Sequence, residues 1–156
     1  LMPGTGPGTT YHYIGAEAKI VDDGWETLGD MGWLDEEGYL YLADRRTDLI
    51  ISGGANIYPA EIEAVLAEHP AVDTAVAIGL PDEDLGQIVH AIVQVRDNWP
   101  VPVEESELRG FLEKQLVRYK TPRTYEFVTY SLRDDAGKVR RSELRNQRIQ
   151  KVNDGN

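Results

Sequence analysis

Two apolar segments in the middle of the chain most constrain its fold. Residues 72–80 and 88–95 are rich in Val, Ile and Ala, and the connection PDEDLG between them carries the Pro, Asp and Gly that are typical of a turn. These segments are predicted to be neighbouring strands. Because a segment with helical periodicity lies on each side of the pair, the pattern predicts an α+β fold with helices packed on a small mixed sheet.

The flanking segments have the apolar spacing of amphipathic helices. The first begins at Pro59, which suits the first position of a helix, and stops before Pro70. The second is indicated by apolar residues at helical steps after Glu104: Leu108, Phe111, Leu112, Leu116 and Tyr119. Beyond it, the segment TYEFVTY predicts another strand, and a last helix is expected from Ser142, whose side chain can cap it.

The first 46 residues have a different pattern. Short apolar stretches at residues 18–21 and 39–43 alternate with turn signals such as Asp23-Gly24, which predicts short antiparallel strands. The chain begins without Met, and we expect it to be part of a longer protein. The predicted organisation is a β-rich segment over residues 1–46, an α+β domain over residues 47–150 and a tail over residues 151–156.

The composition argues against several classes of partner. With 16 Lys and Arg residues against 27 Asp and Glu residues, the chain has a net charge of -11, which disfavours binding to nucleic acids or anionic lipid surfaces. It contains no Cys, and its three His residues stand too far apart in sequence to form a close-spaced pair of metal ligands. No apolar run approaches the ~20 residues that cross a bilayer. We therefore expect a soluble cytoplasmic protein with no metal held by this chain, no nucleic-acid partner and no membrane span.

Four features could carry function, and each also has a simpler structural interpretation. Asp30 lies in a predicted turn, where it could bind sugar hydroxyls or only cap the turn. The pair Gly53-Gly54 could form a tight turn or let a ligand approach the backbone. The charged run over residues 44–48 is typical of a solvated linker. Lys138 lies in a polar loop near several arginines and, taken alone, is most simply a surface residue.

The order of several short motifs adds a resemblance to a known family. Between Tyr13 and Arg145, the chain contains in succession GWETLGD, GYLYLADRRTD, SGGANIYPAEIE, HPAV, GLPDEDLG, YKTPR and AGKVRR. This succession resembles the C-terminal end of AMP-forming acyl-CoA synthetases, which are members of the adenylate-forming superfamily, and in particular its fatty-acid and aryl-acid CoA ligase branch. Each motif is weak alone, but seven in register are specific.

The resemblance implies an acid–thiol ligase. Members of the family activate a carboxylic acid with ATP to an acyl-adenylate, and the thiol of CoA then displaces AMP. Their large N-terminal domain holds the acid pocket and the Mg and ATP ligands, and its motifs are not in this sequence. We therefore expect the chain to act with that missing domain as partner, with ATP, CoA and Mg as cofactors, and to be inactive alone. Residues 1–46 would be the end of that domain, and residues 47–150 would be the mobile C-terminal domain.

By the same resemblance, four positions serve nucleotide binding and adenylation. Asp30 would hydrogen-bond the ribose hydroxyls of ATP, and Arg45 would bind the ribose and the phosphate side of AMP. Thr47 lies at the hinge about which the small domain swings, where the family usually has Lys or Asp. Lys138 matches the catalytic lysine of the last motif, whose ammonium would stabilise the negative charge that builds up as the carboxylate attacks the α-phosphorus.

The glycine-rich segment is expected to serve the second half-reaction, as part of a turn that leads from a strand into a helix. In the thioester-forming pose, Gly53, Gly54 and Ala55 would line the tunnel for the pantetheine arm of CoA, and a Cβ on either glycine would narrow it. Rotation of the domain would then exchange this segment for Lys138 at the active site.

Two other functions are compatible with the sequence. An adenylation domain that loads a carrier protein uses the same chemistry with a different thiol, although GGANIYPAEIE resembles the CoA-ligase branch more closely. A non-catalytic interaction module could keep the same fold. Substitution of Arg45 or Lys138 would have favoured this last reading, and both residues are present.

Overall fold

The chain divides into two compact units, which cover residues 1–47 and 48–156. The computed structural model describes residues 2–3, 19–21, 25–27, 30–34, 36–45 and 48–154.

The first unit contains short antiparallel strands, as the alternation of apolar stretches and turn signals predicts. Strand β3 pairs with both β1 and β2, and β4 pairs with β5. The strands are β1 (Met2–Pro3), β2 (Lys19–Val21), β3 (Trp25–Thr27), β4 (Asp30–Leu34) and β5 (Leu40–Arg45).

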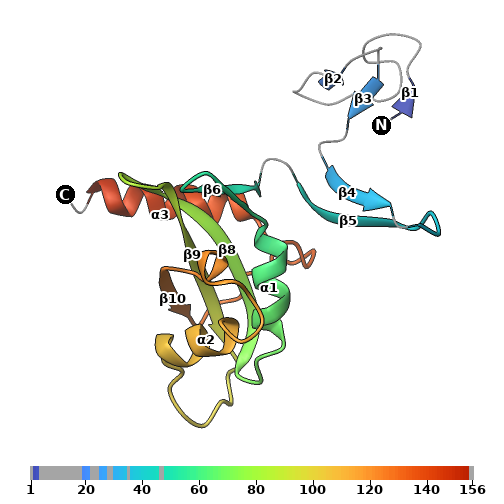
Figure 1. Ribbon diagram of the computed structural model, residues 1–156. Coiled ribbons are helices and arrows are strands. Elements are labelled where there is room, and N and C mark those ends of the chain that lie inside the picture. The colour runs from blue at the N-terminus through green and yellow to red at the C-terminus, as the bar shows by residue number, and fades with distance from the viewer. Residues whose placement is uncertain are drawn as a thin grey trace. The chain divides into compact units, whose positions relative to one another are not determined.

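The second unit is built on a mixed sheet with strand order β10-β9-β8 (Figure 1). Strands β8 (Val72–Asp82) and β9 (Gly86–Val95) form a long antiparallel hairpin, and β10 (Thr124–Val128) lies parallel to β9. The two apolar segments are therefore neighbouring strands, and the predicted mixed sheet is confirmed. Residues on β8 are buried over most of its length, because helices cover both faces of the sheet.

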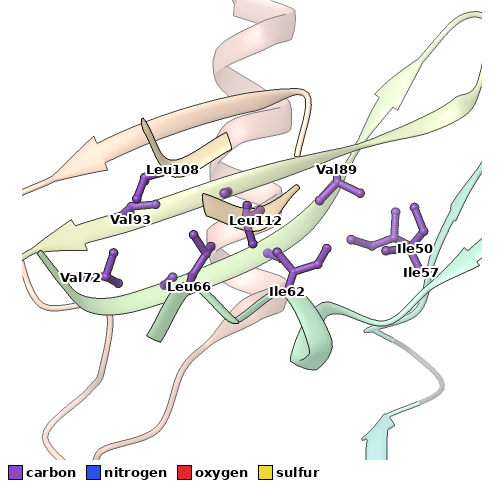
Figure 2. Close-up of a cluster of buried hydrophobic side chains, with 12 residues drawn as sticks. Ile50, Ile57, Ile62, Leu66, Val72, Val89, Val93, Leu108 and Leu112 are labelled. Carbon is purple, nitrogen blue, oxygen red and sulfur yellow. The ribbon is translucent and has the colours of Figure 1, made fainter. Parts of the chain in front are cut away.

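Helices α1 (Pro59–Ala67) and α2 (Glu105–Leu112) pack on one face of the sheet, and α3 (Arg141–Asp154) packs on the other. The first face carries the larger cluster of buried side chains (Figure 2). Burial of a side chain such as Ile62 contributes about 1.5–3 kcal/mol relative to an exposed position. The side chains labelled in Figure 2 are Ile50, Ile57, Ile62, Leu66, Val72, Val89, Val93, Leu108 and Leu112.

The strand period explains how one sheet serves two cores. Along β8, Ala75 and Ala77 join the cluster on the α1 and α2 face, whereas Val76 and Ile78 join the cluster on the α3 face. Leu144 of α3 belongs to this second cluster. Alternate residues of β8 thus face opposite layers of the second unit.

Three boundaries differ from the sequence-based expectation. The helix expected to run as far as Tyr119 ends at Leu112, and a short 3₁₀ helix, η3 (Arg118–Lys120), follows it. The last helix begins at Arg141, so Ser142 is its second residue and does not cap it. The glycine pair, expected in a turn from strand to helix, instead joins two further strands, β6 (Ile50–Ser52) and β7 (Ala55–Ile57).

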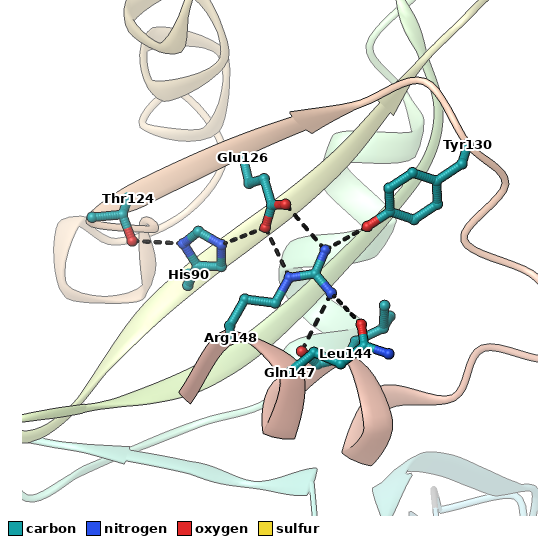
Figure 3. A network of polar contacts seen from close by, with 7 residues as sticks. All are labelled: His90, Thr124, Glu126, Tyr130, Leu144, Gln147 and Arg148. Atoms are coloured by element: carbon teal, nitrogen blue, oxygen red, sulfur yellow. Dashed lines mark hydrogen bonds and ion pairs between the residues drawn. The ribbon is translucent and has the colours of Figure 1, made fainter. Parts of the chain in front are cut away.

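A partly buried polar network holds α3 against the sheet (Figure 3). The guanidinium of Arg148 donates from Nε to Glu126 Oε2 at 2.8 Å and from Nη2 to the Tyr130 hydroxyl at 2.6 Å. His90 Nε2 lies 3.6 Å from the same Glu126 carboxylate, and His90 Nδ1 lies 2.8 Å from Thr124 Oγ1. Partial burial alone would raise the pKa of Glu126, but the hydrogen bond and charge of Arg148 lower it. The network therefore keeps this carboxylate ionised beneath α3.

Candidate functional site

Lys138 lies at the exposed end of a tight turn. An antiparallel bridge between Arg133 and Val139 closes the base of the turn, and Gly137 adopts a φ of 74° that favours glycine. The backbone of Asp134 donates to the Lys138 carbonyl at 2.9 Å. The side chain of Lys138 is exposed, and among residues 48–154 no ion pair engages its ammonium. The lysine can therefore present its charge outward from a defined backbone.

The carboxylate of Asp134 organises this turn. Its Oδ1 accepts the backbone N–H groups of Ala136 at 3.0 Å and of Lys138 at 2.9 Å, and its Oδ2 accepts Arg140 Nε at 2.9 Å. The hydrogen bond from the Lys138 backbone is the largest of the effects that lower the pKa of Asp134. One acidic side chain thus fixes the loop on both sides of the lysine, a role that the sequence analysis missed. An Asp four residues before Lys138, in a loop with Gly137, is the local signal for such a turn.

The glycine pair forms a two-residue hairpin loop between β6 and β7. Gly53 and Gly54 have φ values of 55° and 82°, and the flanking residues Ser52 and Ala55 are paired. Positive φ at both central positions is the pattern of a type I′ turn, which matches the twist of the strands. Gly53 N–H also donates to the carbonyl of Leu85 at 2.9 Å. The turn alone therefore explains why two glycines stand at these positions.

A cavity of about 860 Å³ adjoins this hairpin. Ser52, Gly53 and Ala55 line it on the hairpin side, whereas Gly54 is not among its lining residues. A Cβ at Gly53 would lie 3.2 Å from Leu85 Cδ2, and a Cβ at Gly54 would meet no described atom within 4 Å. Two of the three residues expected to line the CoA tunnel, Gly53 and Ala55, thus line this cavity.

The remaining wall of the cavity is rich in cationic side chains. Arg109 comes from α2, Arg118 from η3, and Arg123 from the start of the segment that leads into β10. Thr121 lines the same cavity, and its buried hydroxyl has no hydrogen-bond partner among the described residues. No role is expected for these residues from the sequence. The clustering of Arg118, Thr121 and Arg123 within six positions is the signal that was available.

The Lys138 turn and the cavity are anchored on opposite faces of the sheet. Leu132 and Val139, which flank the turn, pack in the cluster on the α3 face. Val89 of the cavity wall belongs to the cluster on the α1 and α2 face. The second unit therefore presents an outward ammonium from one side and a cation-lined hollow from the other.

The expected nucleotide-binding residues lie in the first unit. Asp30 and Arg45 are direct cross-strand partners at one end of the β4–β5 pair. Thr47, the expected hinge residue, lies outside the described residues, and the boundary between the two compact units falls directly after it.

Within the described ranges, no group of three or more His, Asp or Glu side chains is arranged to hold a metal ion. No helix of the described residues is long and apolar enough to cross a bilayer.

Comparison with known proteins defines the class. The AMP-binding enzyme C-terminal domain family matches residues 61–138, which include most of α1, the sheet β10-β9-β8 and Lys138. The chain belongs to this family. This agrees with the family resemblance of its motifs and with its layered mixed sheet.

Several individual relatives are CoA ligases or CoA synthetases. The 2-succinylbenzoate–CoA ligase of Geobacillus sp. (strain WCH70) is 44% identical over 143 residues, which are 90% of this chain and 29% of the relative. The structure of o-succinylbenzoate CoA synthetase (MenE) from Bacillus subtilis, in complex with the acyl-adenylate intermediate OSB-AMP, has a TM-score of 0.70 and 42% identity, covering 80% of this chain and 25% of that one. A Mycobacterium tuberculosis fatty acyl CoA synthetase has a TM-score of 0.68 and 42% identity, covering 85% and 26%. The chain thus spans less than a third of the length of these relatives.

Proposed function

We propose that the chain is the C-terminal part of an AMP-forming acid:CoA ligase. Such an enzyme activates a carboxylic acid with ATP to an acyl-adenylate and then transfers the acyl group to CoA. The observation that carries this proposal is the pairing of an outward Lys138 on one face of the sheet with a glycine-edged, arginine-rich cavity on the other. Two half-reactions need these two surfaces in turn.

In the first half-reaction, the carboxylate oxygen of the acid attacks the α-phosphorus of ATP and pyrophosphate leaves. Negative charge grows on the oxygens around phosphorus, and the ammonium of Lys138 stabilises it electrostatically. The rigid turn held by Asp134 fits this task, since it places a mobile side chain on an ordered backbone. Asp30 and Arg45 hold the ribose and phosphate of the nucleotide, and their cross-strand pairing supports a joint site.

In the second half-reaction, the CoA sulfur attacks the acyl carbon and AMP leaves. The pantetheine arm passes along Gly53 and Ala55, and the cavity beside them takes the phosphate-bearing end of CoA. Arginine forks suit phosphates because they donate two parallel hydrogen bonds. Arg109 is committed to the carbonyls of Pro122 and Arg123, so Arg118 and Arg123 are the residues we assign to the phosphates.

Exchange of the two surfaces requires the second unit to turn relative to its partner domain, with the pivot at Thr47. The position of the unit boundary at residues 47 and 48 supports this assignment. Mg²⁺ and the acid pocket belong to the N-terminal domain that the longer relatives suggest. With that domain, the enzyme works on ATP, a carboxylic acid and CoA in the cytoplasm.

The test is a pair of half-reaction assays on the full-length protein that contains this chain. Acid-dependent ATP–pyrophosphate exchange is measured with 2-succinylbenzoate and with fatty acids of several lengths, the acids suggested by the names of the relatives. Thioester formation from preformed acyl-adenylate is measured separately. Lys138→Ala should lower the exchange by at least about 100-fold and leave the second reaction near wild type. Equal loss of both reactions would refute the role of Lys138.

The same protein separates CoA from a carrier protein as the thiol acceptor. Free CoA should compete with a phosphopantetheinylated carrier protein and be used at least as well. Exclusive use of the carrier protein would refute CoA as the acceptor and would identify the protein as a carrier-loading adenylation domain. The present chain alone should show no pyrophosphate exchange, because the acid pocket lies in the other domain.

A further inference from the structure

We propose that Arg141 is a positioning residue that fixes the start of the second unit to the segment carrying Lys138. Arg141 Nη1 donates to Asp48 Oδ2 at 2.5 Å, and its Nη2 donates to both carboxylate oxygens of Glu63 at 2.9 Å. Asp48 is the first residue of the second unit, and Arg141 follows Lys138 by three positions. The inference rests on the proposed function of Lys138 and adds a residue that acts on it through the fold.

The partners of Arg141 are themselves held in place. Glu63 lies in α1, and its Oε1 also accepts the backbone N–H of Ala77 in β8 at 2.8 Å. One guanidinium at the first residue of α3 thus joins the unit boundary, α1 and the sheet. Contacts 93 and 78 residues apart in sequence converge on it.

The environment makes these contacts more than surface ion pairs. The side chains of Arg141, Asp48 and Glu63 are 19%, 21% and 21% exposed, so water screens them only partly. Burial alone would lower the pKa of Arg141, but the Glu63 and Asp48 carboxylates outweigh it and raise the pKa. The planar fork of arginine can serve two carboxylates at once, which a lysine ammonium cannot do with the same geometry.

This arrangement has a mechanical consequence. Because Asp48 is bound to the body of the second unit, a rotation of that unit must take place before Asp48 in the chain. The Lys138 turn then moves together with Asp48 as one rigid piece. Loss of the Arg141 hydrogen bond weakens the attachment of Asp48 to this body, and the ammonium would then reach the reacting phosphate less accurately.

Arg148 provides a matched control. It lies on the same helix, is 5% exposed and forms its own hydrogen bonds to a carboxylate, that of Glu126. Its other hydrogen bonds within residues 48–154 go to Tyr130 and to α3 itself, and not to Asp48. Removal of either arginine weakens the packing of α3. Of the two, only removal of Arg141 breaks a hydrogen bond to Asp48.

The experiment compares Arg141→Gln, Arg141→Lys and Asp48→Asn with Arg148→Gln in the full-length protein. Hydrogen exchange of a peptide covering residues 48–52 should accelerate in the Arg141 and Asp48 variants and stay at the wild-type rate in Arg148→Gln. In pyrophosphate exchange, Arg141→Gln should lower kcat by about 10- to 100-fold with little change in the KM for ATP, since misplacement of a catalytic group has effects of this size. Asp48→Asn keeps the shape of the side chain and guards against a variant that does not fold.

Two results would overturn the inference. The first is unchanged exchange at residues 48–52 in both Arg141→Lys and Asp48→Asn. The second is a loss of kcat in Arg148→Gln equal to that in Arg141→Gln after correction for the folded fraction, because α3 packing alone would then explain both. If the wild-type protein makes no acyl-adenylate, the proposed function fails, and the hydrogen-exchange comparison still decides whether Arg141 anchors Asp48.

Discussion

The backbone N–H of Lys138 points at the carboxylate of Asp134, 2.9 Å away, so the candidate catalytic lysine is held by a residue four positions before it. The same carboxylate receives Ala136 N–H and Arg140 Nε. Small loops with free polar backbone groups have many conformations, and an acidic side chain that accepts several donors selects one of them. The accuracy of the lysine therefore depends on Asp134.

Replacement of Asp134 by Ala should lower the rate of acyl-adenylate formation by about tenfold or more. The turn would lose three hydrogen bonds, and the backbone that carries the Lys138 ammonium would no longer be held in one conformation. The melting temperature should change little, since the turn is exposed. Asp134→Asn keeps an acceptor for the backbone donors, and its rate of acyl-adenylate formation should lie between those of the wild type and Asp134→Ala. Pyrophosphate exchange and thermal unfolding of the full-length protein measure both quantities. A wild-type rate in Asp134→Ala would contradict the role of this turn.

Enlargement of Ala55 should affect only the second half-reaction. Ala55→Leu adds bulk to the wall of the cavity without disturbing the positive φ values of Gly53 and Gly54. Thioester formation should slow and the KM for CoA should rise, while pyrophosphate exchange stays near wild type. Asn56→Leu is the control, because the next residue of a strand faces the other way and Asn56 is exposed. Equal effects of the two variants would exclude a CoA channel at Ala55.

Arg118 should contribute to the affinity for CoA through its charge. Arg118→Ala is expected to raise the KM for CoA by about tenfold, equivalent to about 1.4 kcal/mol, at low ionic strength. The difference from wild type should shrink as salt is added, because exposed charges are screened. Arg96→Ala, an exposed arginine that lines a separate hollow, should have no effect on CoA. Steady-state kinetics at two salt concentrations test this, and a tenfold effect that is independent of salt would point to a structural role.

His90 predicts a dependence of stability on pH. Burial lowers its pKa below the ordinary 6.5, although Glu126 opposes the shift. At a pH near and below 6.5, His90 of the unfolded chain binds a proton more readily than His90 of the folded protein. The free energy of unfolding should therefore decrease as the solution is acidified from about pH 7 to about pH 5. One such proton gives a slope of at most about 1.4 kcal/mol per pH unit.

His90→Gln removes the titrating group and keeps a partner for Thr124, which donates to or accepts from the ring in the native network. Its stability should change less than that of the wild type over the same pH range, as measured by denaturant unfolding. The charged neighbours that remain, Glu126 and Arg148, stay paired throughout this range. An unaltered slope in the variant would show that another group carries the pH dependence.

Local patterns were sufficient for the elements whose residues repeat regularly. The strands β8 and β9, helix α1 and the mixed sheet were predicted because the spacing of apolar residues along a short segment indicates its secondary structure. The prediction was wrong at two helix ends. The helix α2 ends at Leu112 although the apolar spacing continues to Tyr119, and Ser142 lies inside α3 although it suits a cap.

The sequence by itself determined the family, the central pair of strands with its flanking helices, and Lys138 as the candidate catalytic residue, because these depend on residue types and their spacing along the chain. Only the tertiary structure decided that Asp134 holds the lysine turn, that arginines line a cavity beside the glycine hairpin, and that Arg141 joins Asp48 across 93 residues. Such contacts follow from how the layers pack around the sheet, and no local repeat in the sequence encodes which distant charges will meet.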